Sequence, residues 1–303
     1  MQSREWVGPT GHLHGVCADG STFQAPPGKV GLERDLYTRT NHAGKKDREI
    51  ELWFGREVET PFGVVLPRLM SLEGLKRRPF PNRGDPQARQ DVIDLGFRML
   101  PYDEYLPVSS SERSAIEGYL AAMVVRTPRY LAKLTTWFAD QQPDAPPSAN
   151  TARQSRNLAL ENMLRLHEAY RAELRRAYIS LVVADCDREF LFADCGATAK
   201  EPWRNTPMPF DLYVPLTPSI ALSAMPVPDT NTGVLSVARM SSQGVARFNR
   251  TIVGNAERFV YSRSAPPLDF IRKNFGNPGP QPIGTRWVDG NLEVTYDRSR
   301  DRR

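Results

Sequence analysis

Cysteine is scarce in this chain of 303 residues and follows no framework spacing. Three cysteines are present, Cys17, Cys186 and Cys195, and such an odd, unpatterned set argues against a secreted scaffold held together by disulfides. The opening residues lack the apolar run of a signal peptide. No stretch reaches the roughly 18 consecutive apolar residues of a membrane-spanning helix. We therefore expect a cytoplasmic protein with no membrane partner.

The sequence motifs of several enzyme classes are also absent. No Gly-rich loop ends in Gly-Lys-Ser/Thr, no G-x-G-x-x-G follows a predicted strand, and no G-x-S-x-G elbow occurs. Cysteines and histidines do not show the paired spacing of a zinc site. The one close pair, His12 and His14, would share a strand face, but no third ligand lies near it in the sequence. We interpret this pair as a polar strand face and expect no cofactor and no metal.

The charge balance is basic, with a net charge of +5 and a pI of about 9.2. This balance is typical of proteins with nucleic-acid partners. Only seven of the 40 basic residues are Lys, which leaves 33 Arg, and a GC-rich genome produces that bias without any ligand. Acidic residues are interleaved with the arginines, as in residues 171–176, and the densest basic run is the terminal segment 298–303. A nucleic-acid partner is therefore an alternative rather than the main expectation.

The first hundred residues predict one hairpin followed by interrupted helices. Residues 12–24 flank an Asp-Gly pair, which is a strong signal for a tight turn. Residues 47–75 are helical in parts, with interruptions at Pro61 and Pro67. A loop and a short helix are predicted to follow, over residues 76–86 and 86–99.

The middle of the chain gives the clearest helical pattern. A helix begins near Ser110, and apolar residues recur along one face as far as Phe138. Pro128 should kink this helix or divide it in two. A second long helix is predicted over residues 152–177. The chain reads as one domain over residues 1–303, with a possible internal boundary in the Pro-rich loop 141–150.

The second half is richer in strands. Residues 178–184 form a β-branched strand, and residues 189–193 are predicted to return beside it as a hairpin. Further strands are predicted at 210–216, 219–224 and 259–262, helices at 241–257 and 267–275, and a final hairpin at 287–294. Because strands and helices do not alternate regularly, we predict an α+β fold in which long amphipathic helices pack on a mainly antiparallel sheet.

Four carboxylates lie close together around the predicted hairpin at residue 185. Clustered carboxylates can hold Mg²⁺ for phosphodiester cleavage, so Asp185, Asp187 and Glu189 are weak candidates for metal ligands. Exposed turns are also rich in Asp, and that interpretation is favoured for these three. Asp194 differs because it follows an apolar strand and so lies at a strand end, where side chains often reach a pocket. We predict that Asp194 is partly buried and that Arg126 or backbone donors in the following turn are its partners.

Two further polar residues lie within apolar helical patterns. Arg126 precedes Thr127-Pro128 at the predicted kink, where unbonded carbonyls offer hydrogen-bond partners. Asn249 lies on the helix predicted over 241–257. With Asp194, these two residues complete the set of candidate catalytic residues, and a shared pocket would support a catalytic role.

The same segments resemble a family of uncharacterised bacterial proteins, the domain of unknown function 4238 family. The resemblance consists of an opening strand region that leads to Leu-Tyr, an Arg-Thr-Pro after a helix, an apolar strand that leads to an Asp, a Pro-Leu-Thr-Pro, and a helix with an Asn that runs into a strand. The matching segments in chain order are 30–38, 126–128, 190–196, 215–218 and 248–262. Together they span about residues 12–265.

Two features of the family are missing here. The family opens with a His-x-x-Pro motif, and this chain begins downstream of it, so we expect the reading frame before Met1 to encode that segment. The Ser and Pro that flank the family's Asp are also absent around Asp194. The family has no established activity, so the resemblance implies none.

Two functions are compatible with these patterns. The first is an accessory protein without catalysis, associated with a mobile-element or phage-defence gene set. The alternative is a metal-dependent hydrolase of nucleic acid, in which Asp194 and neighbouring carboxylates bind Mg²⁺ and Arg126 positions a phosphate.

Overall fold

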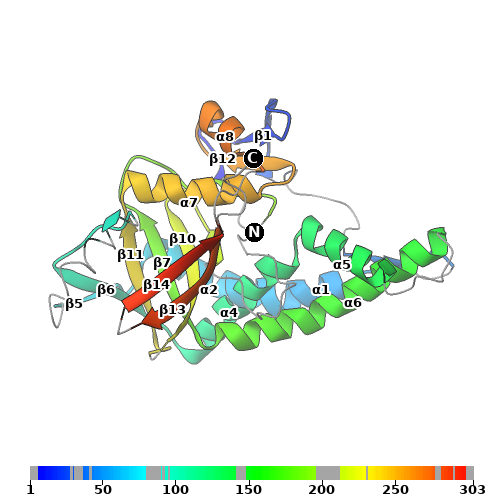
Figure 1. Cartoon of the computed structure of the whole chain (residues 1–303), viewed down its shortest axis with the longest axis horizontal. Helices are drawn as coiled ribbons and strands as arrows, with labels where there is room; N and C mark the ends of the chain where they lie inside the picture. The colour runs from blue at the N-terminus through cyan, green and yellow to red at the C-terminus, as the bar shows by residue number, and fades with distance from the viewer. Residues whose placement is uncertain are drawn as a thin grey trace.

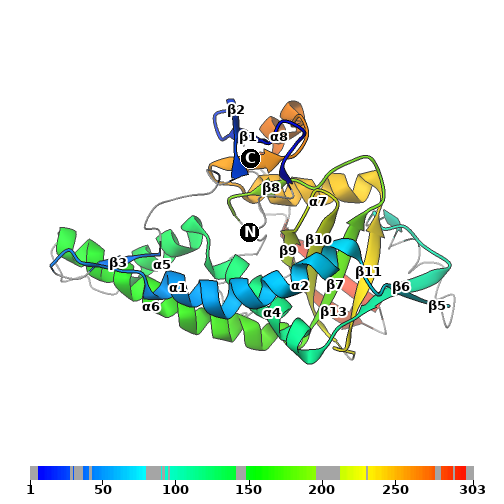
Figure 2. The same cartoon turned by 180° about the vertical axis from the view of Figure 1, so that it is seen from behind.

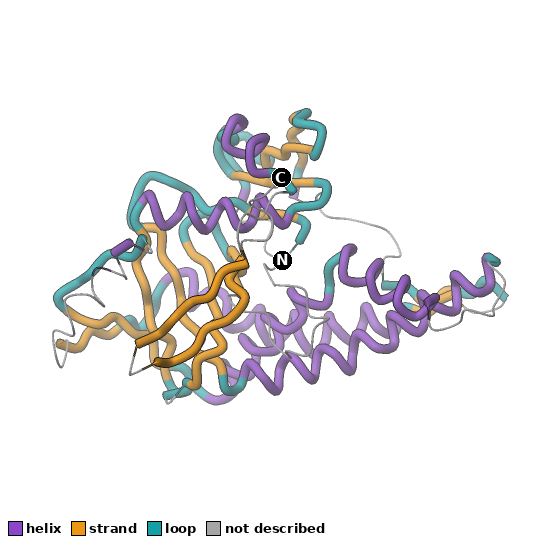
Figure 3. Tube along the Cα trace, in the orientation of Figure 1, coloured by secondary structure: helices purple, strands orange, loops and turns teal. Residues whose placement is uncertain are grey.

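The computed structural model places a sheet at one end of the molecule, a bundle of helices that projects from it, and a smaller layer of strands and helices above both (Figures 1 and 3). The structure describes residues 6–27, 30, 37–40, 43–79, 90, 93–94, 96–140, 148–195, 212–229, 231–276, 281–288 and 291–297. Helices and a mainly antiparallel sheet confirm the predicted α+β class.

The main sheet has six strands. Their order is β5 (Lys76–Pro79), β6 (Tyr102–Pro107), β11 (Val234–Met240), β7 (Ala177–Ala184), β10 (Ile220–Pro228) and β9 (Leu212–Pro215). All neighbours are antiparallel except β11 and β7. The central strand β7 is buried on both faces, because Ile179 and Leu181 belong to one hydrophobic cluster and Val182 belongs to another. Its near-continuous apolar sequence follows from this position.

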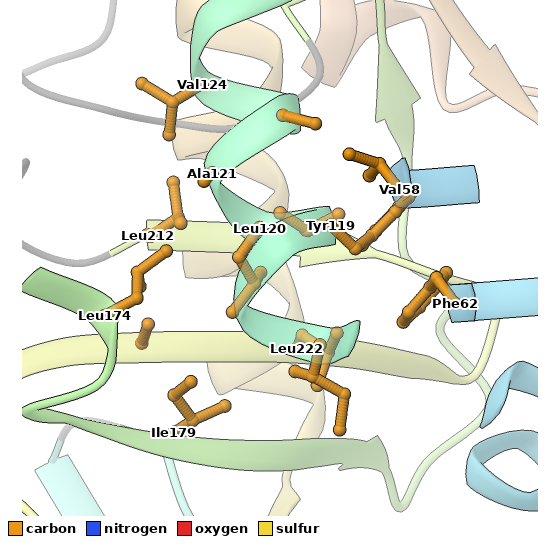
Figure 4. Close-up of a cluster of buried hydrophobic side chains, with 14 of the residues drawn as sticks. Val58, Phe62, Tyr119, Leu120, Ala121, Val124, Leu174, Ile179, Leu212 and Leu222 are labelled. Carbon is orange, nitrogen blue, oxygen red and sulfur yellow. The ribbon is translucent and has the colours of Figure 1, made fainter. Parts of the chain in front are cut away.

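A bundle of helices packs against one face of the main sheet and projects beyond it (Figures 1 and 2). It consists of α1 (Glu49–Phe54), the π-helical turn η3 (Gly55–Glu59), α2 (Thr60–Ser71), α4 (Ser110–Val125), α5 (Pro128–Asp140) and α6 (Ala149–Leu174). Figure 4 shows α4 lying between these helices and the sheet, with Leu120 directed towards Ile179 and Leu222. Because α4 has neighbours on most sides, its buried residues extend around the helix instead of forming one stripe.

A second, four-stranded sheet lies above the first (Figure 1). Its order is β2 (Thr22–Ala25), β1 (Leu13–Cys17), β12 (Phe259–Ser262) and β8 (Phe192–Ala193), and it packs with α7 (Ser242–Asn255) and α8 (Leu268–Asn274). Two short hairpins complete the fold: β3 (Arg39–Thr40) with β4 (Lys46–Asp47), and β13 (Gln281–Val288) with β14 (Asn291–Asp297). The β13–β14 hairpin lies in front of the main sheet in Figure 1 and behind it in Figure 2.

Local signals predicted several elements well. The β1–β2 hairpin turns at Asp19-Gly20, where Gly20 has a φ of 81°. The helices α4 and α5 separate at Arg126 and Thr127, before Pro128, as predicted. Strands β9 and β12 and helices α7 and α8 lie in their predicted segments, β7 begins one residue earlier than predicted, and β10 continues to Pro228, four residues beyond its predicted end. The long helix α6 begins and ends three residues earlier than predicted, because Ser148 caps its first turn.

The two prolines of the first long helix do not interrupt it, so that prediction was wrong. The segment from Glu49 to Ser71 is helical throughout, with the π turn in its middle. Pro61 lies in the first turn after the π segment, and Pro67 is exposed and removes a single backbone hydrogen bond. The apolar face of α2 buries Phe62 and Leu69, which compensates for that loss.

Three strand predictions need correction. Residues 189–193 do not return beside β7, because only Phe192–Ala193 form a strand and this strand pairs with β12. The predicted loop begins with the edge strand β5, and charged, Pro-containing sequences are common on sheet edges. Strands β6 and β11 have no predicted counterpart. Parts of other predicted segments lie outside the described residues: 28–29, 31–36, 80–89, 91–92, 141–147, 196–211, 289–290 and 298–303.

Candidate functional site

Asp194 anchors the end of β8 to the turn before β12. Its Oδ1 accepts a hydrogen bond from the backbone N–H of Glu257 at 3.0 Å, and its Oδ2 accepts one from the N–H of Arg258 at 2.8 Å. The Arg258 Nε lies 3.7 Å from the same carboxylate, and the Asp194 side chain is 7% exposed. The predicted burial is therefore correct. The partners are donors from the α7–β12 turn and not Arg126.

Asn249 holds the segment that leads into β8. Its Oδ1 accepts from the N–H of Leu191 at 2.8 Å, and its Nδ2 donates to the carbonyl of Glu189 at 2.8 Å. The amide thus makes the two hydrogen bonds that a neighbouring strand would make. The Glu189 carboxylate accepts from the N–H and Oγ of Ser264. Side chains from α7 and the chain after β12 therefore fix residues 189–194.

Arg126 lies in the helical layer, at the C-terminal cap of α4. Its guanidinium lies over the rings of Phe54 at 4.9 Å and Tyr37 at 5.1 Å, and it forms an ion pair with Glu59 in the π turn. The Tyr37 hydroxyl donates to the Arg126 carbonyl at 2.9 Å. This carbonyl is one of those left without a helical partner at the break between α4 and α5. Tyr37 therefore caps the carbonyl at the helix break, and the Arg126 guanidinium binds α4 to the π turn.

The three candidate catalytic residues do not form one pocket. Asn249 bonds the segment that leads to Asp194, Asp194 bonds the α7–β12 turn, and Arg126 packs in the helical layer with a separate set of partners. A groove with other lining residues lies elsewhere in the upper layer. It has a volume of about 390 Å³ and runs between the β1–β2 hairpin and the start of α8, with His14, Gln24 and Leu268 in its lining.

The weak metal candidates face different partners. Asp185 pairs with Arg98, with 3.1 Å between Oδ2 and Nε. Asp187 is exposed, and Glu189 bonds Ser264. Among the described residues, no three His, Cys, Asp or Glu side chains gather at metal-binding distance. In the part of the chain that the structure describes, no helix is both long and apolar enough to cross a membrane.

A buried ionic cluster escaped the sequence interpretation. Arg113 is 3% exposed, and its Nε lies 2.9 Å from Glu117 and its Nη1 lies 3.1 Å from Asp229. Its Nη2 donates to the carbonyl of Ala177 at 2.7 Å. The cluster joins α4 to the start of β7 and to the end of β10. The spacing of Arg113 and Glu117 by four residues inside an apolar helix was the available signal.

His167 is buried between the rings of Trp53 and Phe54. Its Nε2 donates to the carbonyl of Gly118 at 2.9 Å, which assigns the proton of the neutral ring to Nε2. Burial lowers the pKa of His167 below its usual 6.5, although the Gly118 carbonyl and Glu168 act in the opposite direction. The neutral imidazole is therefore the form that the folded protein favours.

This shift predicts an acid-sensitive contribution to stability. Below pH 6.5 the unfolded chain binds a proton at His167 that the folded chain does not bind. The free energy of unfolding should then decrease as the pH is lowered, by up to about 1.4 kcal/mol per pH unit. His167→Gln keeps a donor for Gly118 and does not titrate. Urea unfolding at several pH values should show wild type losing stability relative to this variant as pH falls below 6.5. Parallel pH profiles would contradict the assignment.

Asp194→Asn tests the anchor at the end of β8. An amide keeps one acceptor oxygen and presents an NH₂ group to the second backbone N–H. We expect the free energy of unfolding to decrease by about 1–3 kcal/mol, as for other buried hydrogen-bond partners that are lost. Denaturant unfolding measures the change, and Asp187→Asn is the matched control on an exposed carboxylate. Equal stability of the two variants would remove Asp194 as an anchor.

Comparison with known proteins gives one match. A family described as Protein of unknown function (DUF4238) matches residues 4–266. The match includes both sheets, α1 to α7 and every candidate residue above. No curated protein and no solved structure matches the chain.

Proposed function

We propose that this chain, which belongs to the DUF4238 family of proteins of unknown function, is an accessory protein that acts by binding and not by catalysis. This proposal rests on the observation that the polar side-chain atoms of Asp194 and Asn249 are occupied by hydrogen bonds to the backbone. Both carboxylate oxygens of Asp194 accept backbone hydrogen bonds, and both polar atoms of the Asn249 amide bond backbone groups. A catalytic acid or base must instead reach a proton on the substrate.

A nucleic-acid hydrolase is the alternative that needs an experiment. It requires a carboxylate that binds Mg²⁺ and a cation that binds phosphate in one place. Asp194 and Arg126, the residues suggested for these two roles, lie in different layers of the fold. We therefore favour the accessory role.

Turnover assays separate the two functions. The purified chain is incubated with DNA and with RNA in Mg²⁺, in Mn²⁺ and in EDTA, beside Asp194→Asn. We expect no metal-dependent cleavage by either protein. Cleavage by wild type that disappears in Asp194→Asn, while the variant keeps its melting temperature, would overturn the accessory role.

Cellular setting belongs to the same proposal. Cys17 and Cys186 form no disulfide within the described residues, and the three cysteines of the chain follow no framework spacing. Both observations support a reducing compartment such as the cytoplasm. We also propose an association with phage defence or mobile elements. Deletion of the gene, followed by plaque counts with a panel of phages, tests that association.

A further inference from the structure

The ribbon formed by β5 and β6 carries three adjacent basic residues, Lys76, Arg77 and Arg78, on an exposed strand. It forms one edge of the main sheet and lies at the extremity of the molecule in both views (Figures 1 and 2). All four residues of β5, Lys76 to Pro79, are exposed. Arg77 faces Glu104 across the ribbon, and Arg78 faces Asp103. Because neighbouring residues of a strand point to opposite faces, the two arginines lie on opposite faces of the ribbon.

Each arginine makes two contacts on the ribbon, one with a carboxylate and one with a tyrosine ring. The Arg77 Nε lies 3.0 Å from Glu104, and its guanidinium lies 4.7 Å from the centre of the Tyr102 ring. The Arg78 Nε lies 3.2 Å from Asp103, and its guanidinium lies 5.5 Å from the centre of the Tyr105 ring. Ring stacking and the Nε contact reduce the rotamer freedom that an exposed arginine otherwise loses on binding.

Within the described residues, the ion pairs of both arginines with Glu104 and Asp103 use Nε and not the terminal nitrogens. The two arginine side chains are 58% and 56% exposed. Two adjacent Nη groups form a fork that matches two oxygens of one phosphate. The ribbon therefore presents one such fork on each face.

Among the described residues, the carboxylates of the ribbon do not neutralise its positive charge. Glu104 is fully buried, and it is shared between Arg77 and Arg239, whose Nε lies 2.6 Å away. Burial alone raises the pKa of Glu104, but the hydrogen bonds from Arg239 and Arg77 hold it below the usual value. On the ribbon itself, Lys76, Arg77 and Arg78 thus oppose the two carboxylates of Asp103 and Glu104, and Arg239 of β11 adds a further positive charge beside Glu104. The ribbon keeps an excess of positive charge.

We propose that the β5–β6 ribbon binds the phosphodiester backbone of a nucleic-acid duplex, with one arginine fork on each strand. This inference rests on the proposed binding role and names its ligand. The major groove of B-form DNA is about 12 Å wide and admits a two-stranded ribbon. Because β6 also pairs with β11, the ribbon enters the groove with its outer β5 edge first, and forks on opposite faces then meet opposite groove walls. An acidic peptide would need only one of the two faces. Both tyrosine rings already stack on arginines and so do not contact the bases. The ribbon therefore recognises the phosphate backbone and not the base sequence.

Fluorescence anisotropy with a labelled duplex of about 20 base pairs tests the ribbon. The wild-type chain is compared with Arg77→Ala/Arg78→Ala over a salt series from about 50 to 200 mM. Loss of two phosphate contacts should weaken binding by roughly tenfold at the higher salt and lower the slope of log affinity against log salt by about 2. Duplex RNA and single-stranded DNA are the further arms, and we expect duplex DNA to bind most tightly.

The matched control is Arg175→Ala/Arg176→Ala, which removes another exposed, adjacent pair of arginines. It should keep wild-type affinity. Arg77→Lys/Arg78→Lys retains the charge without the fork, and it should bind more weakly than wild type even if the alanine variant folds poorly. Three outcomes would each overturn the proposal. They are an equal loss of affinity in the Arg175/Arg176 control, tighter binding of poly-glutamate than of duplex DNA, and no binding of duplex DNA by wild type at low salt. Cleavage of a bound duplex would overturn the accessory role alone.

Discussion

Arg113→Ala is expected to lower the free energy of unfolding by about 3–5 kcal/mol, the usual effect of breaking a buried ion pair on one side. The substitution leaves Glu117 and Asp229, both less than a tenth exposed, without their cation. It also removes the donor to the Ala177 carbonyl at the start of β7. Equilibrium urea unfolding measures the change.

Two further variants distinguish the loss of the buried ionic cluster from the general effect of removing a positive charge. Arg56→Ala breaks an ion pair with Glu57 in which Arg56 is 76% exposed, and it should cost at most about 1 kcal/mol. Arg113→Met combined with Glu117→Gln and Asp229→Asn removes the uncompensated charges and should recover part of the loss. If Arg113→Ala unfolds like Arg56→Ala, the cluster does not hold α4 to the sheet.

Asn249→Ala is the second substitution with a large expected effect. It leaves the N–H of Leu191 and the carbonyl of Glu189 without partners, and each buried backbone group without a partner costs about 1–3 kcal/mol. We therefore expect a decrease of about 2–4 kcal/mol in the free energy of unfolding. Hydrogen exchange at the Leu191 amide should become faster in the variant, because that amide loses its hydrogen bond to the Asn249 side chain.

A control exists on the same helix. Asn255 donates to the carbonyl of Thr251 one turn earlier and is only partly buried. Asn255→Ala should change stability by less than about 1 kcal/mol, since water replaces that contact. Similar effects of the two alanine substitutions would show that the hydrogen bonds of Asn249 do not hold the segment before β8.

Sequence patterns predicted the elements whose signals are local. The Asp-Gly turn of β1–β2 and the break before Pro128 each depend on a few adjacent residues. The apolar strand β7 was evident because burial on both faces leaves it few polar positions. The edge strand β5 has neither alternation nor apolar residues, so nothing in Lys76–Pro79 distinguishes it from a loop.

The roles of the candidate residues depend on contacts between distant parts of the chain. Asn249 bonds residues about sixty positions away, and Asp194 bonds Glu257 across a similar separation. Burial of Asp194 could be predicted from the apolar strand before it. Its partners could not, because no local pattern specifies which turn the fold brings beside a strand end. For Arg126, the break before Pro128 correctly placed the residue at a helix end, but the hydrogen bond to the carbonyl there comes from the Tyr37 hydroxyl, and the guanidinium pairs with Glu59.

The pairing of β1 with β12 has a consequence for synthesis in the cell. Gly15 faces Tyr261, 246 positions later in the chain. At a translation rate of about 5–20 residues per second, strand β1 therefore waits about 12–50 s for its partner. During that time the β1–β2 hairpin stands alone, and an isolated hairpin is marginally stable in water. Leu13 and Val16, fully enclosed in the finished fold, are exposed on the nascent chain over this interval, where a ribosome-associated chaperone would find them.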